Sequence, residues 1–359
     1  MSNFQDRINK QEKSIWRYAE FYNEFIKSEN RLYLEDVIFQ QAQDNTFMIM
    51  KAKLLKNINY LYFKREDENL TGSLKERSLA YQVSLAKQNG KKELVISTSG
   101  NAGIAAAAYC QESGIKLYVF ISIETEKAKI AQMQKYNPII IKSKKAIRLA
   151  NYLSAKYKIE NLRPSINDSS IEGFKSIAFE IFEKLEEVDA LFTYVTSGSS
   201  FVGIARAYKY LKDAGEIKKI PKLFAVQSGE IFSVAEEFGK IDKKENSSAG
   251  KLGVKNTKRK NEIIEFIKLS KGSGIYINDK EIKEARKLLE KNNIYTSPEG
   301  CASFAAIIKE EKKNNFDKVV CILSGKKREN TSQINEEAIK IAESFNDIDN
   351  MMSGKFDCC

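Results

Sequence analysis

Histidine is absent from this chain of 359 residues, and proline and tryptophan are scarce, with four and one copies. Without an imidazole, the chain cannot use a Ser-His-Asp or Cys-His mechanism, a histidine-bearing zinc site or an imidazole pH switch. Any general acid or base must therefore be lysine, aspartate, glutamate, tyrosine or cysteine.

Long apolar runs are absent as well. No stretch of about 18 apolar residues occurs, and the polar N-terminus lacks the apolar core of a secretory signal. We therefore expect a soluble, cytoplasmic protein with no membrane partner. Metal-ligand spacing is also missing among the cysteines, and their odd number favours a reducing compartment without a metal site. The five cysteines are Cys110, Cys301, Cys321, Cys358 and Cys359.

The charge is unbalanced, with 59 Lys+Arg against 48 Asp+Glu and a formal net charge of +11. Lysine is mixed with glutamate along the chain, however, and no recognisable nucleic-acid-binding module accompanies the charge. We predict no nucleic-acid partner. The hydrophobic share of 42% is ample for a folded core, and the length indicates roughly two domains.

Short apolar runs alternate with longer amphipathic stretches. Strands are predicted at residues 61–63, 94–97, 117–121, 139–142, 191–195, 223–227 and 319–323. Helices are predicted at residues 78–89, 102–112, 126–135, 144–156, 177–185, 204–211, 279–292 and 302–312. This alternation indicates βαβ units, and hence an α/β protein of two lobes.

The predicted lobes are discontinuous in sequence. We assign residues 80–165 to a smaller lobe, 51–79 and 166–345 to a larger one, and 1–50 to a helical lead packed on the larger lobe. The polar stretch 240–271 is predicted to be a surface insertion, with a basic docking loop as the alternative, and 346–359 a flexible tail.

Three loops that follow predicted strands are rich in hydroxyl groups and contain glycine: residues 68–75, 97–101 and 196–200. Loops of this composition at the carboxyl ends of parallel strands offer backbone N–H groups and hydroxyls to an anion. The first of them ends in a lysine, Lys75.

The motifs in these loops resemble those of pyridoxal-phosphate enzymes of fold type II, the tryptophan synthase β-like superfamily. Residues 64–77 are similar to its K-x-E-x-x-N-P-T-G-S-F-K-D-R signature, and 97–103 to its S-S/T-G-N-x-G loop. Residues 196–203, 297–302 and 323–325 resemble its phosphate loop, E-P-x-x-A/G-A-A segment and late [ST]-G turn, in the family's order.

Within this superfamily, the chain is most similar to threonine synthases. Residues 15–18 resemble their W-R-Y segment, Asn69 matches their asparagine, and 171–181 resemble I-E-G-x-K-T-I-A-F-E-I. The resemblance implies two lobes, each a largely parallel sheet flanked by helices, with the cofactor in the cleft between them. It also implies pyridoxal 5'-phosphate as the cofactor.

The resemblance assigns roles to individual residues. Lys75 would bind the cofactor covalently and then remove the substrate α-proton. The other cofactor-binding residues would be Asn101 at the phenolic oxygen, Ser324 at the pyridine nitrogen, and Thr196, Ser197, Gly198, Ser199 and Ser200 at the phosphate. The substrate carboxylate would be held by Thr98 and Ser99, and a second anion by Ser73, Lys175 or Arg77, with the choice left open.

The activity implied is conversion of O-phosphohomoserine and water to threonine and phosphate, so the partner would be a small anionic amino acid. The alternatives are a cysteine synthase-like or serine/threonine dehydratase-like enzyme, or a catalytically degenerate binding protein with this fold. A homodimer is left open. Glu299 is either an acid of the cleft or part of a helix N-cap.

Overall fold

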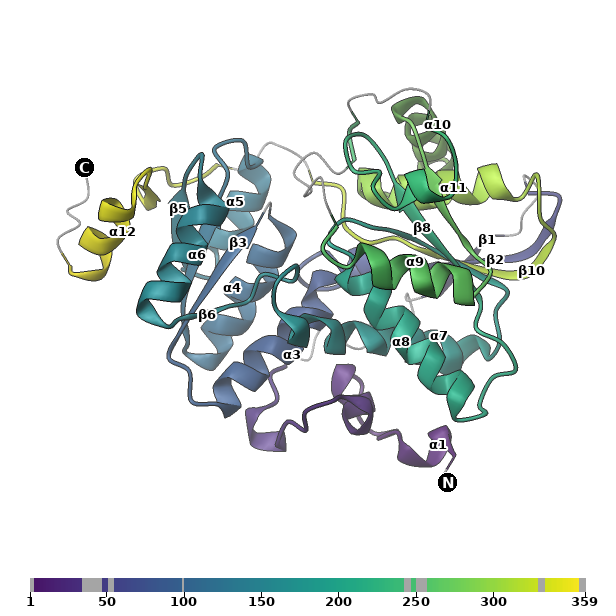
Figure 1. The fold of residues 1–359 in the computed structure, drawn as a ribbon, viewed down its shortest axis with the longest axis horizontal. Helices are drawn as coiled ribbons and strands as arrows, with labels where there is room; N and C mark the ends of the chain where they lie inside the picture. The colour runs from purple at the N-terminus through teal and green to yellow at the C-terminus, as the bar shows by residue number, and fades with distance from the viewer. Residues whose placement is uncertain are drawn as a thin grey trace. The chain divides into compact units, whose positions relative to one another are not determined.

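The computed structural model describes residues 3–33, 47–50, 55–98, 100–241, 247–249, 257–328 and 333–354, with only the backbone of 47–50. The chain divides into two compact units (Figure 1). The first comprises Met1–Phe25, Asp36–Leu74 and Ile171–Lys327; the second comprises Ile26–Glu35, Lys75–Ser170 and Arg328–Cys359.

The first unit is built on a six-stranded sheet with the order β1-β2-β10-β7-β8-β9. Its strands are β1 (Phe47–Met50), β2 (Ile58–Lys64), β7 (Ala190–Tyr194), β8 (Lys222–Gln227), β9 (Ser273–Tyr276) and β10 (Phe316–Ile322). Only β1 runs antiparallel to its neighbour. Strands buried on both faces are continuous apolar runs, as in β7, and this is why the apolar pattern located them.

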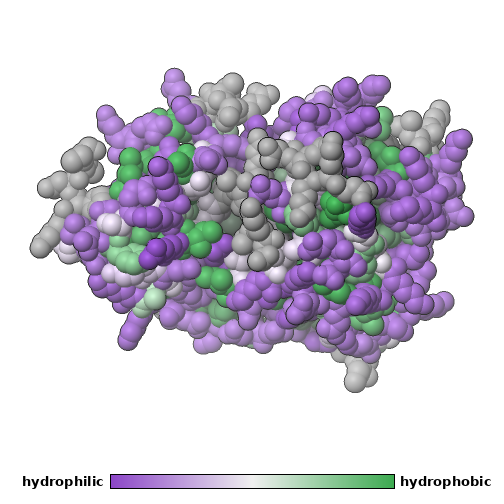
Figure 2. All heavy atoms as spheres, turned by 45° about the horizontal axis from the view of Figure 1, so that its top comes forward, coloured by the Kyte–Doolittle hydropathy of each residue, from purple (hydrophilic) through white to green (hydrophobic). Residues whose placement is uncertain are grey.

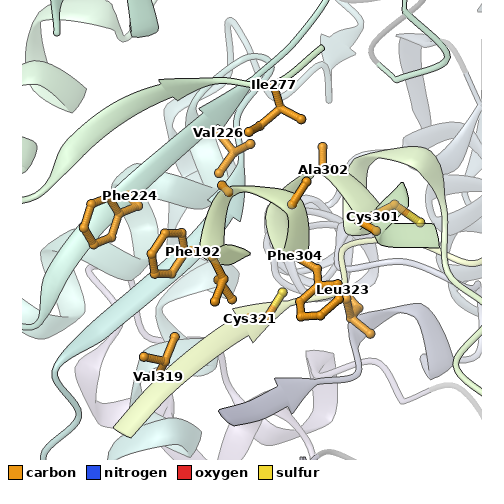
Figure 3. Close-up of a cluster of buried hydrophobic side chains, with 14 of the residues drawn as sticks. Phe192, Phe224, Val226, Ile277, Cys301, Ala302, Phe304, Val319, Cys321 and Leu323 are labelled. Atoms are coloured by element: carbon orange, nitrogen blue, oxygen red, sulfur yellow. The ribbon is translucent and has the colours of Figure 1, made fainter. Parts of the chain in front are cut away.

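Helices cover both faces of this sheet. Helices α10 (Asp279–Glu290) and α11 (Pro298–Glu310) lie on one face, and α7 (Lys175–Leu185), α8 (Ser199–Asp213) and α9 (Lys260–Leu269) on the other (Figure 1). Figure 3 shows the core beneath α11, where Phe304 points toward strand residues including Cys321. The rings of Phe192 and Phe224 stack with centroids 4.2 Å apart across β7 and β8.

The second unit contains a five-stranded parallel sheet with the order β11-β5-β4-β3-β6. Its strands are β3 (Glu93–Thr98), β4 (Lys116–Ile121), β5 (Ile139–Lys142), β6 (Glu160–Asn161) and β11 (Ile339–Ile341). Its helices are α3 (Lys75–Gln88), α4 (Asn101–Ser113), α5 (Lys127–Gln134), α6 (Ala146–Tyr157) and α12 (Phe345–Met352). The expected α/β class, with two largely parallel sheets flanked by helices, is confirmed.

The N-terminal segment is less helical than predicted. It contains the four-residue helix α1 (Phe4–Arg7) and the 3₁₀ turns Ile15–Phe21 and Ser28–Asn30. Aromatic side chains attach it to the first unit: the ring of Phe4 lies 5.4 Å from that of Phe179 on α7. The segment therefore takes its conformation from packing, because turns this short do not persist alone in water.

The predicted surface insertion at residues 240–271 is wrong over its second half. Helix α9 buries Ile263 and Ile267 against the sheet, and β9 follows it directly. Its polar residues had masked the i, i+4 spacing of these two isoleucines. Residues 242–246 and 250–256 of the stretch lie outside the described part of the chain.

The predicted division also differs at the C-terminus. The chain joins the second unit from Arg328 onward, because β11 adds to the edge of its sheet beside β5. The first part of the predicted flexible tail is helix α12, which begins with a capping box at Ser344 and fully buries Ile348. Its Phe345 ring stacks on Tyr152 of α6 with centroids 4.1 Å apart. The remainder of that tail, from residue 355, lies outside the described residues.

Hydrophilic residues cover most of the face seen in Figure 2, and hydrophobic ones form small separate patches among them. Within the described ranges, no helix has both the length and the apolar character needed to cross a membrane.

The packing of α12 leads to a stability prediction. Replacing Ile348 by Ala should lower the free energy of unfolding by about 2–5 kcal/mol, because a buried isoleucine leaves a cavity. Urea titration followed by circular dichroism measures this change. The matched control is Asn350→Ala on the exposed side of α12, expected to shift stability by about 0.5 kcal/mol or less. Equal effects of the two variants would contradict the packing of α12.

Candidate active site

Three of the predicted functional segments leave one edge of the first sheet. Strands β2, β10 and β7 are parallel neighbours, with Ile322 paired to Lys64 and Cys321 paired to Phe192. The chain segments that follow these strands therefore emerge together at the carboxyl edge, where ligands of such sheets bind. These segments lead to Lys75, to Ser324 and to the loop 196–200.

The backbone before Lys75 is bonded directly to the turn that contains Ser324. Leu74 N donates to Ser324 O at 3.1 Å, and Lys326 N donates to Gly72 O at 2.9 Å. Gly72 has φ +74°, a conformation that favours glycine, so the turn can bring these groups together. Lys75 is the first residue of α3 and is half-buried.

The same turn is attached to the start of α11. Ser297 N and Thr296 Oγ1 both donate to Gly325 O, at 2.7 and 2.9 Å. Ser297 is also the N-cap of α11 and accepts from Gly300 N. Glu299 lies in the first turn of this helix, as its N-cap alternative predicts, where a negative charge is favoured by the helix dipole.

A buried ion cluster supports the loop before Lys75. The Lys64 side chain is fully buried, with its Nζ 2.7 Å from Glu180 Oε2 on α7 and 3.1 Å from the equally buried Glu66 Oε1. Burying an ammonium is costly unless carboxylates compensate it, so the three side chains hold one another in place.

Asn69 extends this cluster to the loop. Its Nδ2 donates to Glu66 Oε2 at 2.8 Å and to Ser73 O at 3.2 Å. The conformation of the loop therefore depends on the buried ions. The sequence alone assigns no role to Lys64, Glu66 or Glu180, although a charged residue at the end of an apolar run can indicate a buried ion pair.

The W-R-Y segment at residues 15–18 is attached to α7, one turn beyond Glu180. Arg17 Nε and Tyr18 Oη donate to Glu183 Oε2 at 2.9 and 2.8 Å, and Trp16 is buried. Burial raises the pKa of Tyr18 well above its ordinary value, and the charges of Glu180 and Glu183 raise it further. Tyr18 therefore acts as a neutral hydrogen-bond donor.

Lys175 is not available for the role predicted for it. It is buried, and its Nζ donates to Glu172 Oε2 at 2.7 Å, Asn23 Oδ1 at 3.2 Å and Phe21 O at 3.4 Å. An ammonium has three N–H groups, and all three serve the attachment of the N-terminal segment. The resemblance placed this lysine correctly on its helix but could not locate its partners, which are distant in sequence.

Ser73 and Arg77, the other candidates for the second anion, flank Lys75. Ser73 is buried and its backbone forms a bridge with Gly325. Arg77 is also buried, and its charge acts on Tyr109 of α4.

The hydroxyl-rich loop at residues 97–101 lies at the carboxyl edge of β3 in the second unit. Thr98 Oγ1 accepts from Gly100 N at 3.0 Å, and α4 begins at Asn101. The Asn101 Oδ1 atom is buried and has no hydrogen-bond partner within the described ranges. A Cβ atom on Gly103 would lie 2.6 Å from the Thr98 methyl group, so this helix turn packs directly on the strand end. Ser99 lies outside the described residues.

The loop at residues 196–200 connects β7 to α8 and turns at Gly198, whose φ is +89°. Ser199 and Ser200 are buried in the first turn of α8, and Thr196 and Ser197 are half-buried before it. The N-cap residue is Gly198, which has no side chain to cap this helix end. A helix N-terminus presents backbone N–H groups, an arrangement that suits a phosphate.

The turn at Ser324, the loop 196–200 and the segment that leads to Lys75 thus follow neighbouring strands at the carboxyl edge of the first sheet. Comparison with known proteins shows the family of the chain. Residues 41–325 match the family described as pyridoxal-phosphate dependent enzyme. The chain belongs to this family. It is a pyridoxal-phosphate-dependent enzyme of fold type II.

Among individual proteins, it is similar to threonine synthase of Methanocaldococcus jannaschii, with 28% identity over 94% of this chain and 86% of the relative. It is also similar to threonine synthase of a Bacillus species, with 27% identity over 86% and 90%.

Solved structures share the fold. Serine racemase from Dictyostelium discoideum superimposes with a TM-score of 0.67 at 22% identity, covering 82% of this chain and 97% of that one. An O-acetylserine-dependent cystathionine β-synthase from Helicobacter pylori gives 0.66 at 20% identity, covering 82% and 96%.

The residues present fit pyridoxal phosphate. Lys75 would supply an amine for the aldehyde, and the start of α8 would supply backbone N–H groups for the phosphate. The amide of Asn101 is buried, and its oxygen has no hydrogen-bond partner among the residues that the structure describes. An amide presents donors and an acceptor, so this group is suited to bonding a ring substituent.

The buried ions give a second prediction. Lys64→Met should lower the free energy of unfolding by about 3–5 kcal/mol, because it leaves Glu66 buried without its cation. Chemical unfolding measures the change, and adding Glu66→Gln should recover part of the loss. The control is Lys56→Met at an exposed position before β2. A Lys64→Met protein as stable as the control would contradict the proposed support of the loop.

A third prediction concerns Asp67. Burial raises the pKa of this carboxyl from 3.8 to about 6, although Arg65 opposes the shift. Between those values the folded protein binds more protons than the unfolded chain, so stability falls as pH rises from about 4 to 6, by about 3 kcal/mol at most.

Asp67→Asn should flatten this part of the stability–pH curve, measured by urea titration at several pH values. Asp213→Asn, at an exposed residue of α8, is the control and should keep the slope. An unchanged slope in Asp67→Asn would show that another group titrates.

Proposed function

We propose that this enzyme is a threonine synthase-like lyase of the cytoplasm. It would convert O-phosphohomoserine and water to threonine and phosphate. The observation that supports this most is the loop that ends in Lys75, held against Ser324 by backbone hydrogen bonds and supported by buried ions. The similarity to threonine synthases over most of their length supports the choice of substrate.

When bound, pyridoxal phosphate supplies an electron sink for a carbanion at the substrate α-carbon. The chain must hold the cofactor and transfer protons. Lys75 would hold the cofactor covalently and remove the α-proton, a role open to lysine because its amine can lose its proton when partly desolvated. With no histidine in the chain, lysine is also the expected base.

The remaining residues would bind and orient. The hydroxyls and N–H groups of the loop 196–200 would hold the cofactor phosphate, Asn101 its phenolic oxygen and Ser324 its ring nitrogen. A hydroxyl at that nitrogen stabilises positive charge less than a carboxylate does, which suits elimination and replacement reactions. Thr98 and Ser99 would hold the substrate carboxylate.

The substrate's phosphate needs a pocket of its own. Since the ammonium of Lys175 is committed to Glu172, Asn23 and Phe21, it no longer qualifies. Of the candidates from the sequence, Ser73 and Arg77 are left, on either side of Lys75.

The cofactor and the lysine are tested together by visible absorbance. The purified protein should show the absorbance of lysine-bound pyridoxal phosphate, and Lys75→Ala should abolish it. Lys91→Ala, an exposed lysine shortly after α3, is the matched control and should leave the spectrum unchanged. A protein that remains colourless after reconstitution would favour a degenerate binding protein.

The reaction is tested by phosphate release from O-phosphohomoserine, with loss of O-acetylserine in the presence of sulfide and deamination of threonine as the comparison assays. Release of phosphate with formation of threonine supports the proposal. A coloured protein that is silent in this assay but active in another would refute threonine synthesis and assign a different elimination or replacement reaction.

A further inference from the structure

Two buried side chains hold the backbone at the start of the loop 196–200. Thr257, which lies in the stretch predicted as a surface insertion, is buried, and its Oγ1 donates to Thr196 O at 2.9 Å. Gln227, the last residue of β8, is fully buried, and its Nε2 donates to Val195 O at 3.4 Å. Two consecutive carbonyl groups are therefore bonded to side chains from other parts of the first unit.

Other buried groups fix these two donors in turn. Gln227 Oε1 accepts from the backbone N–H groups of Val234 and Ala235 at 2.9 and 3.0 Å, which leaves its NH2 group for the loop. Ser233 Oγ, also buried, donates to Thr257 Oγ1 at 3.4 Å, so the hydroxyl hydrogen of Thr257 is available for the loop. The donors therefore belong to one network in the interior of the first unit.

The peptide bond converts these contacts into directions for the N–H groups of the loop. A trans peptide is planar, and its C=O and N–H groups point to opposite sides. Because the Thr196 carbonyl is turned toward Thr257, the N–H of Ser197 points away from it, and the Val195 carbonyl has the same effect on the N–H of Thr196. Neither N–H donates to an acceptor within the described part of the chain.

Thr257 also packs against the next residue of the loop. A Cβ atom added to Gly198 would lie 3.2 Å from Thr257 Cγ2 and 2.5 Å from Ile263 Cδ1. The methyl group of Thr257 therefore lies close to Gly198 while its hydroxyl bonds Thr196. One side chain thus restricts the loop by packing and by a hydrogen bond, and a loop held in this way loses little further freedom when it binds a ligand.

We propose that Thr257 and Gln227 are positioning residues for the phosphate of pyridoxal phosphate. Neither needs to contact the phosphate. They hold two successive peptides so that the N–H groups of the loop 196–200 are oriented before the cofactor binds, which avoids the cost of ordering the loop on binding. This inference rests on the proposed function, because that function assigns this loop to the cofactor phosphate.

The test compares two cofactors in the full-length enzyme freed of its own. Dissociation constants are measured by visible absorbance for pyridoxal phosphate and for pyridoxal, which has the same ring and aldehyde but no phosphate. Thr257→Val keeps the branched shape and removes the hydroxyl. It should weaken pyridoxal phosphate about 3- to 30-fold, since Thr196 O loses its donor, and leave pyridoxal within about twofold. Thr257→Ser, which restores the hydroxyl, should recover most of the affinity.

Gln227→Glu tests the second contact. It keeps the acceptors for Val234 and Ala235 but has no NH2 group to donate to Val195 O. Pyridoxal phosphate should again be weakened more than pyridoxal. If this variant does not fold, the two Thr257 variants decide.

The matched control is Thr193→Val. Thr193 lies on β7 and is fully buried, but its hydroxyl has no hydrogen-bond partner among the described residues. This variant makes the same chemical change near the loop without removing a contact to it, and it should bind both cofactors like the wild type.

The ratio of the two dissociation constants separates positioning from general stability. Equal weakening of both cofactors by Thr257→Val, no weakening of either, or no recovery in Thr257→Ser would overturn the inference. Gly198→Ala, which distorts the loop itself, should weaken pyridoxal phosphate selectively. If it does so while Thr257→Val does not, the loop binds the phosphate without help from Thr257. A wild type that shows no Lys75-dependent absorbance would instead remove the proposed function itself.

Discussion

Lys64 stands at the end of a strand with its ammonium fully buried, and two carboxylates, from Glu66 and Glu180, compensate its charge. One carboxylate comes from the turn that follows the strand and the other from α7. Through Asn69 this charge cluster determines the shape of the loop, and the loop ends at Lys75. Because the Lys64 ammonium is the cation that both carboxylates share, the sheet, the helix and the loop must adopt their positions together.

The order of the parallel strands positions the other candidate site segments of the first unit. Pairing of Ile322 with Lys64 makes β2 and β10 end at the same level, so Leu74 and Ser324 meet through their backbones. Strand β7 lies next to β10 and delivers the loop 196–200 to the same edge. Segments far apart in sequence thus come together through the strand order, a property of parallel sheets generally.

Much of the architecture was predictable because its signals are local. Apolar runs located β3, β4, β5, β7 and β8, and the glycines at 72 and 198 marked turns whose φ values are positive. The short strands β1, β6, β9 and β11 gave weaker signals, since each gains its hydrogen bonds from a neighbour at or near a sheet edge. Helices α9 and α12 escaped prediction because charged and amide residues alternate with their apolar ones, and the buried face becomes evident only in the packed structure.

The sequence by itself determined the fold class, the family and the order of the loops, since each depends on residues close together along the chain. The tertiary structure alone decided which charges meet. Lys175 and Lys64 are both lysines within recognisable motifs, yet one holds the N-terminal segment and the other the loop before Lys75. The same is true of Arg259, whose contact with Ser199 spans 60 residues. A buried charge selects its partner by distance in space, and that distance exists only once the chain has folded.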